Sequence, residues 1–394
     1  MTDQGAPSNS LFYSRDGFGP GPRLIAAQRD DPIRRARDFY LFRTGDYWLV
    51  TRHADVRRVL ADPETFGMHD PDRARVLPYE LINMDAPDHT RLRRVLTSEF
   101  TARRVRRLLP SIARKVDDLL DAMESRGAPA DLMKDFALPL PAWVVCELLG
   151  VPYTDREEFQ RRSREALNLE RPLEERLAAS RESHAYMASL VAEKRQNPDD
   201  QLIGMVIREH GDKVSDAELT GVSDLLLLAG HETTSNMIGL GALLLLEHPE
   251  QAERLRTAAE DDPVVDTAVE ELLRYLSVSS VPMARTARTD TELGGVEIKA
   301  GEQVLCNLPV ANRDPALGAD MDRFDIERAP APHVTFGHGV HHCIGAPLAR
   351  AELRIAIRNL LRRFPNLRAT QPVRDMPFRT DEEVYGLYAL PVTW

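Results

Sequence analysis

The spacing of apolar residues along this chain predicts a mainly helical protein with a few short strands. In residues 111–123, for example, Ile112, Val116, Leu119 and Leu120 recur at the three- and four-residue spacing of a helix face. Residues 47–51 have the β-branched and aromatic character of a strand, and residues 286–310 resemble turns and strands. Periodicity together with capping and proline signals predicts helices over residues 53–61, 87–109, 111–123, 157–167, 173–194, 215–248, 264–275 and 347–364.

No repeat and no Gly/Ser-rich linker interrupts this pattern, so we expect one compact domain over residues 1–394. The first residues are polar and lack the charged-then-apolar layout of a signal peptide. The most apolar stretch, residues 225–246, is interrupted by His231, Glu232 and Thr233, so it does not read as a membrane span. The sequence therefore predicts a cytoplasmic protein without a membrane anchor.

Charge and cysteine content narrow the class of protein. A formal net charge of −11 argues against a nucleic-acid partner, which would require a basic footprint. The three cysteines, Cys146, Cys306 and Cys343, are too few for a disulfide framework and fit a reducing compartment. Cys146 and Cys306 lie in apolar runs and read as small buried hydrophobes, whereas Cys343 has polar and glycine neighbours.

The segment from Phe336 to Arg350 surrounds Cys343 with glycines directly before a predicted helix. Glycine permits turns with positive φ and close approach of the backbone to a flat ligand. The free N–H groups at the start of a helix would favour the thiolate form of the cysteine. Two other readings are a structural cysteine in a turn and a zinc site with His338 and His341. Zinc is disfavoured because no second Cys/His pair lies at a suitable spacing.

An acid and an alcohol, Glu232 and Thr233, interrupt the apolar helix predicted over residues 215–248. Buried polar groups of this kind are costly unless they are hydrogen-bonded or used in chemistry. The threonine hydroxyl can bond a backbone carbonyl of the preceding turn, and Gly230 would leave room for a groove beside it. A metalloprotease motif is excluded because position 235 is Ser rather than the second His of H-E-x-x-H.

The cysteine segment resembles the haem-binding signature of bacterial cytochromes P-450, in particular those of actinobacterial secondary metabolism. Its core is matched by Phe336, Gly339, Cys343 and Gly345, and its fuller bacterial form also by Gly337, His341, Leu348, Ala349 and Arg350. The resemblance extends from about Tyr47 to Trp394. It implies the mainly α cytochrome P-450 fold with small β-sheets, a haem b whose iron is bound by Cys343, and monooxygenase activity.

The resemblance also assigns roles to residues that have no clear function taken singly. It implies that Glu232 and Thr233 relay protons to dioxygen at the haem. It implies that Glu271 and Arg274, which alone could be an ordinary solvated pair, form a structural charge cluster with Arg328. Haem carries two propionates that need cationic partners. The residues expected to contact the haem are His89, Arg93, Arg285, His341, Phe336, Gly337 and Cys343.

The substrate pocket is placed by the resemblance as well. Its walls are expected within residues 66–82, 166–186, 226–233, 277–283 and 384–385. These segments mix apolar and polar residues, which favours a bulky hydrophobic substrate with some oxygen functions. The resemblance to actinobacterial members of the family implies that this substrate is a natural product, such as a polyketide or macrolide, which is hydroxylated or epoxidised. The individual residues expected to line the pocket are Leu226, Ala229, Gly230, Val281, Met283 and Val384.

Two arginine clusters predict a docking surface for an acidic electron donor. One comprises Arg350, Arg354, Arg358 and Arg362, which recur every four residues on the last helix. The other comprises Arg103, Arg104, Arg106 and Arg107. Ferredoxin and ferredoxin reductase are the expected partners, although two solvated helix faces would give the same pattern. A peroxide-driven peroxygenase and a non-catalytic haem-binding protein remain as alternative functions.

Overall fold

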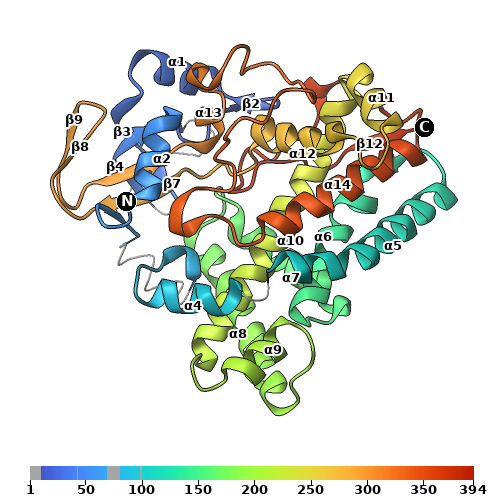
Figure 1. Cartoon of the computed structure of the whole chain (residues 1–394), viewed down its shortest axis with the longest axis horizontal. Coiled ribbons are helices and arrows are strands. Elements are labelled where there is room, and N and C mark those ends of the chain that lie inside the picture. The colour runs from blue at the N-terminus through green and yellow to red at the C-terminus, as the bar shows by residue number, and fades with distance from the viewer. Residues whose placement is uncertain (1–9, 42, 69–79, 98–99) are drawn as a thin grey trace.

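The computed structural model describes residues 10–41, 43–68, 80–97 and 100–394, and helices dominate it (Figure 1). The longest helices are α5, α8 and α10. In chain order the α-helices are α1 Pro22–Asp30, α2 His53–Ala61, α4 Asp88–Thr97, α5 Ala102–Arg126, α6 Pro139–Leu149, α7 Arg156–Leu167, α8 Leu173–Gln196, α9 Leu202–His210, α10 Asp216–Leu246, α11 Pro249–Thr257, α12 Pro263–Leu276, α13 Leu308–Ala311 and α14 Ala346–Arg363.

Short strands form small sheets, and the largest of these carries residues of the site. It has the order β3-β4-β10-β7-β5, in which β10 pairs parallel with β4 and antiparallel with β7. Its strands are β3 Ile33–Tyr40, β4 Arg43–Val50, β5 Phe66–Gly67, β7 Met283–Ala287 and β10 Gln303–Cys306. The other sheets are formed by β1 Arg15–Asp16 with β2 Gly19–Pro20, by β8 Thr291–Leu293 with β9 Val296–Ile298, and by β6 Ala130–Asp131, β11 Arg368–Ala369 and β12 Pro391–Thr393. The mainly α fold with small β-sheets is therefore confirmed.

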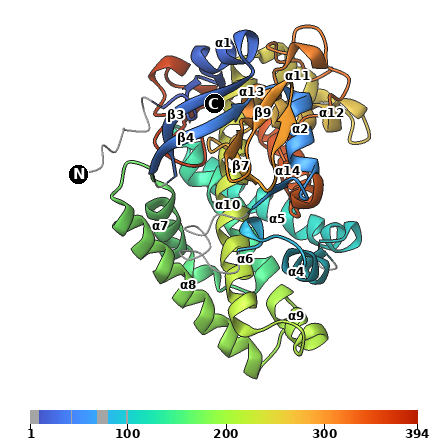
Figure 2. The same ribbon diagram turned by 90° about the vertical axis from the view of Figure 1, so that its left-hand side faces the viewer.

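Helix α10 runs through the middle of the molecule and packs against α6, α8, α12 and α14 (Figures 1 and 2). It begins with the capping box expected from the sequence, because the Ser215 side chain accepts from the backbone N–H of Glu218 and Glu218 returns the bond. Its C-terminal half, from Ser235 to Leu245, is buried on every face. A helix this apolar is stable because other helices surround it.

The basic region before residue 126 folds differently from the expectation. Instead of helices over 87–109 and 111–123, α4 ends at Thr97 and α5 runs unbroken from Ala102 through Pro110 to Arg126. Thr101 caps α5 by accepting from the N–H of Arg104. An internal proline costs about 3 kcal/mol, and the burial of the apolar face of α5, which packs against α14, offsets that cost.

The other predicted helices appear within three residues of their expected ends. Helices α1, α6, α9, α11 and α13 were not predicted, and α6 lies in the apolar run around Cys146. Such a short apolar run fits a buried strand as well as a helix. In the part of the chain that the structure describes, no helix combines the length and apolarity that crossing a bilayer requires.

Candidate active site

The Cys343 loop is held by backbone contacts that require glycine at two positions. The N–H of Cys343 donates to the carbonyl of Phe336 at 2.8 Å, which closes the loop. Gly337 and Gly339 have φ values of +70° and +71°, a region that other residues rarely adopt. A Cβ on Gly339 would also lie 2.3 Å from the carbonyl oxygen of Leu60 in α2. The loop therefore presents Cys343, which retains exposed surface, just before α14.

The surroundings of the Cys343 sulfur act on its ionisation in opposite directions. Crowding by protein atoms raises the pKa of the thiol. The N–H groups of Gly345 and Ala346 and the positive charges of Arg93 and Arg350 lower that pKa. This combination of helix-start N–H groups and nearby cations is the environment that stabilises a thiolate once a positive partner is supplied.

Four cationic or ionisable side chains from distant parts of the chain meet beside this loop. The rings of His89 in α4 and His341 lie 4.1 Å apart, and Arg93 donates to the carbonyl of His342. Arg285 in β7 is 4% exposed, and its Nη1 donates to the carbonyl of Ala284 at 2.7 Å. The structure thus brings together the four residues expected to contact haem propionates.

The electrostatics of this cluster fit a dianionic ligand. Burial and the positive charges of Arg285, His89 and Arg93 lower the pKa of His341 to about 3. The Nε2 atom of His89 is buried and has no hydrogen-bond partner among the described residues. None of the ion pairs formed in the described part of the chain includes any of these four residues. A buried arginine without a paired carboxylate is costly, and Arg285 and Arg93 supply two positive charges beside the two histidines, so the cluster matches the two propionates of a haem.

Thr233 and Glu232 on α10 have different partners. The Thr233 hydroxyl donates to the carbonyl of Ala229 at 2.8 Å, the bond to the preceding turn that the sequence predicts. The Glu232 carboxylate is 2% exposed, and it accepts from Nη1 of Arg379 at 3.1 Å. Arg379 also pairs with Glu382. Sequence reasoning missed Arg379, which belongs to no motif and lies far from α10 in the chain.

The acidity of Glu232 reflects this network. Burial alone would raise the pKa of Glu232, but His231 and Arg379 lower it to about 2. Nε2 of His231 is 3.4 Å from the carboxylate, without the geometry of a hydrogen bond. The ionised carboxylate of Glu232 is therefore held by a buried arginine from the C-terminal segment.

Glu271, Arg274 and Arg328 meet as the resemblance implies. Arg274 makes two bonds to the Glu271 carboxylate, at 2.7 and 2.8 Å, and Nε of Arg328 adds a third at 3.3 Å. Arg274 also donates to the carbonyls of Asn312 and Met321, so the cluster ties α12 to the irregular segment that precedes the cysteine loop. Both Glu271 and Arg274 are buried.

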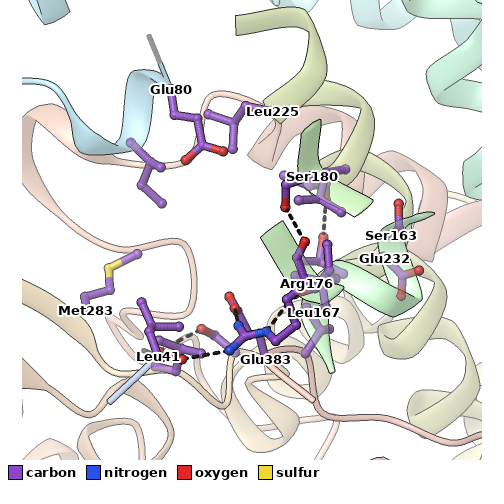
Figure 3. A pocket seen from close by; sticks show the side chains of 18 of the residues that line it. Leu41, Glu80, Ser163, Leu167, Arg176, Ser180, Leu225, Glu232, Met283 and Glu383 are labelled. Carbon is purple, nitrogen blue, oxygen red and sulfur yellow. Dashed lines mark hydrogen bonds and ion pairs between the residues drawn. The ribbon is translucent and has the colours of Figure 1, made fainter. Parts of the chain in front are cut away.

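A cavity of about 260 Å³ extends along one face of α10 (Figure 3). Of the residues predicted to line it, Ala229, Val281, Met283 and Val384 do so. The α10 side chains on the cavity include Leu225, Leu228, Ala229 and Glu232, which are spaced as one helix face.

Two predicted pocket residues lie elsewhere. Leu226 and Gly230 are not among the residues that line the cavity, because their positions fall on the next face of α10. Leu226 packs with the cluster of apolar residues that includes α6 and α9. A Cβ on Gly230 would meet Val145 of α6 at 3.0 Å. The absence of a side chain at Gly230 therefore permits close helix packing rather than a groove.

The cavity has charged walls that the sequence did not reveal. Arg176 of α8 donates to the carbonyl of Leu41 at 2.7 Å and to the carboxylate of Glu383 at 2.8 Å, so three distant segments meet there (Figure 3). Arg162, Ser183 and Asp224 line it as well.

The two basic clusters expected to dock an electron donor differ in the structure. On α14, Arg350 pairs with Glu270, Arg354 pairs with Asp266, and Arg358 donates to the carbonyl of Ala258. Three members of that stripe are therefore engaged within the molecule, which weakens its interpretation as a free docking surface. On α5, Arg103, Arg106 and Arg107 are exposed, while Arg104 is partly buried and contacts Met205.

Comparison with known proteins agrees with the fold. The family model for "Cytochrome P450" matches residues 166–384. The chain is 42% identical to "Cytochrome P450 165B3" of Amycolatopsis orientalis, over 98% of both proteins. The solved structure of P450 StaH from glycopeptide antibiotic A47934 biosynthesis has a TM-score of 0.87 and 46% identity, covering 98% of this chain and 100% of that one. CYP105P1 in complex with filipin I gives a TM-score of 0.90 and 40% identity over 99% of both chains.

These findings define the class as a haem-iron monooxygenase. The chain belongs to the cytochrome P450 family.

Proposed function

We propose that this cytochrome P450 holds haem b through the Cys343 sulfur, with His89, Arg93, Arg285 and His341 beside the propionates. The observation that carries the proposal is the cluster of two arginines and two histidines beside the Cys343 loop, in which none of the four side chains forms an ion pair with a carboxylate of the described residues. Phe336 and Gly337 shape the Cys343 loop, because the Phe336 carbonyl accepts from the N–H of Cys343 and Gly337 adopts a positive φ. When bound, the haem supplies the oxygen activation and the oxidising power, while the protein controls ligation, protons and access.

We propose that Glu232 and Thr233 deliver protons to the reaction. Thr233 has a hydroxyl on the cavity wall that can both accept and donate. Glu232 also borders the cavity but is paired with Arg379, so it must exchange that partner, through a side-chain movement or a water, to take up a proton. Glu271, Arg274 and Arg328 have a structural role in this proposal, because their contacts join α12 to the segment before the loop.

The proposed substrate is a bulky, largely hydrophobic natural product with some oxygen functions, which is hydroxylated or epoxidised. The cavity supports this class because its wall combines apolar side chains with a few charged and hydroxyl groups. The relatives support it too: one belongs to glycopeptide antibiotic biosynthesis, and another was solved with filipin I.

Ferredoxin and ferredoxin reductase are the proposed electron donors. Exposed arginines at positions 103, 106 and 107 of α5 would attract an acidic partner. Neutralising Arg103 and Arg107 together to Gln is expected to slow reduction by ferredoxin and to flatten its salt dependence. The control change Arg354→Gln, at an arginine already paired with Asp266, should have a smaller effect on the reduction rate and on its salt dependence. Equal effects of the two changes would contradict docking on α5.

Product formation distinguishes the proposed monooxygenase from a peroxygenase or a non-catalytic haem-binding protein. A panel of macrolide-type substrates is incubated either with NADPH, ferredoxin and reductase under oxygen, or with hydrogen peroxide. Wild-type protein should form product with the electron-donor system, and Thr233→Ala should form about 100-fold less, as expected for loss of a proton-transfer group. Product only with peroxide would favour the peroxygenase, and no product with either would favour the haem-binding protein.

A further inference from the structure

Three polar residues on adjacent helices line the cavity at some distance from Thr233: Arg162 of α7, Ser183 of α8 and Asp224 of α10, where the Ser183 hydroxyl donates to the Asp224 carboxylate. Asp224 and Thr233 lie on the same helix, and at a rise of about 1.5 Å per residue they are about 13 Å apart along its axis. A polar group this far from the proposed proton-transfer residues does not serve the chemistry directly.

The Arg162 guanidinium lacks the partners that a buried arginine normally has. The residue is 8% exposed, and its Nε and Nη2 atoms are enclosed with no hydrogen-bond partner among the described residues. Its Nη1 is 3.9 Å from the Glu158 carboxylate, which Arg161 also contacts at 3.2 Å. The Arg162 guanidinium otherwise lies 4.9 Å from the ring centre of Tyr186. Buried donors without acceptors are unfavourable, so a ligand oxygen that draws this group into the cavity would be bound well.

Asp224 supplies acceptor capacity on the same wall. Its carboxylate accepts from the Ser183 hydroxyl at 2.6 Å, and His184 Nδ1 is 3.8 Å away. Two carboxylate oxygens offer more acceptor sites than these contacts use. Burial raises the pKa of Asp224, while Ser183, His184 and the charge of Arg162 oppose that rise, so the Arg162 and Asp224 charges influence each other.

The opposite charges of Arg162 and Asp224 favour a neutral ligand group over an anion, which Asp224 would repel. A hydroxyl fits both sides, because it can accept from the guanidinium and donate to the carboxylate at once. We propose that Arg162, Ser183 and Asp224 form a subsite that recognises a substrate hydroxyl and so fixes which distant carbon lies near Thr233. This inference rests on the proposed function, because it names a substrate feature of the same cavity.

The test uses haem-loaded protein and isothermal calorimetry with two probes, 1-decanol and decyl methyl ether. The ether keeps the acceptor oxygen but has lost the donor hydrogen. Wild-type protein should bind the alcohol more tightly. Arg162→Met should weaken binding of both probes about tenfold, the size expected for loss of a hydrogen bond to a charged group. Asp224→Leu should weaken binding of the alcohol and leave that of the ether nearly unchanged.

Arg164→Met is the matched control, since it removes an exposed arginine from the same helix and should leave both affinities unchanged. Arg162→Gln, which keeps side-chain N–H donors, should recover part of the lost affinity and shows that the effect is not one of folding. Unchanged affinities in Arg162→Met, or equal losses for both probes in Asp224→Leu, would overturn the subsite. The absorption spectrum of the reduced, carbon monoxide-bound protein separates failure of the subsite from failure of the proposed function. If wild-type protein shows no thiolate band in this spectrum, it is the proposed function that fails.

Discussion

Two clusters of ionisable side chains in this cytochrome P450 are built in opposite ways. In the cluster of Glu271, Arg274 and Arg328, the carboxylate and the guanidinium groups satisfy one another within the protein. In the cluster of His89, Arg93, Arg285 and His341, burial and the neighbouring positive charges, that of Arg285 first, lower the pKa of His341 to about 3. The first cluster is complete without a ligand and the second is not. The difference separates residues that hold the fold from residues that await an anionic cofactor.

The largest expected effect is the loss of stability when the cluster of Glu271, Arg274 and Arg328 loses its carboxylate. Glu271→Ala would leave the Arg274 guanidinium buried without its carboxylate, so the free energy of unfolding should fall by about 3–5 kcal/mol. Urea unfolding followed by circular dichroism measures this change. Glu253→Ala is the matched control, because Glu253 pairs with Arg256 on an exposed helix surface, and it should leave stability unchanged. Equal midpoints for the two variants would contradict a structural role for Glu271.

The next effect concerns the pairing of Glu232 with Arg379. Arg379→Met would leave the carboxylates of Glu232 and Glu382 buried without their shared cation and should lower the free energy of unfolding at pH 7 by about 3 kcal/mol. In wild type, the pKa of about 2 means that the contribution of Glu232 to stability is present above its unfolded value of about 4.3 and declines as pH falls toward 2.

In the Arg379→Met variant the pKa values of both Glu232 and Glu382 should rise, so protonation relieves the unpaired charge as pH falls. The stability difference between variant and wild type should therefore shrink between pH 7 and pH 5. Urea unfolding at both pH values measures it. A difference that does not depend on pH would show that Arg379 stabilises the fold without controlling the charge of Glu232 or Glu382.

The smallest expected effect is on haem retention, when the cluster of His89, Arg93, Arg285 and His341 loses one arginine. Arg285→Met removes one cation from the proposed propionate site and should speed transfer of haem to excess apomyoglobin about tenfold, while leaving urea stability of the haem-loaded protein near the wild-type value. Arg37→Met, at an exposed arginine of the same sheet paired with Asp46, should not change the transfer rate. A transfer rate unchanged in Arg285→Met would show that this cluster does not hold the cofactor.

Contacts between residues close together in the chain could be predicted from the sequence more readily than contacts between distant segments. The Cys343 loop and the bond from Thr233 to Ala229 were predictable because each depends on residues close together in the chain. The Glu271, Arg274 and Arg328 contacts followed from a family motif rather than from local physics. Arg379 could not be predicted, because its contact with Glu232 joins the central helix to the C-terminal segment and neither segment signals the other.

The cavity was the least predictable part, although most of its segments were anticipated. Residues 226–233 were correctly placed beside it, but the rotation of α10 turns Leu226 and Gly230 toward other helices. The predicted break before residue 111 was wrong for a related reason, since packing of α5 against α14 carries the helix through Pro110. Rotation of a buried helix and tolerance of a proline both depend on neighbours that lie far away in the chain.

The central claim is that the Cys343 sulfur binds the haem iron, and the absorption spectrum of the reduced, carbon monoxide-bound protein tests it most directly. Wild-type protein should show the Soret band at the wavelength diagnostic of thiolate ligation, and Cys343→Ser should lose that band, whereas Cys306→Ser should keep it. A wild-type spectrum without the thiolate band, or a Cys343→Ser variant that retains it, would contradict the account.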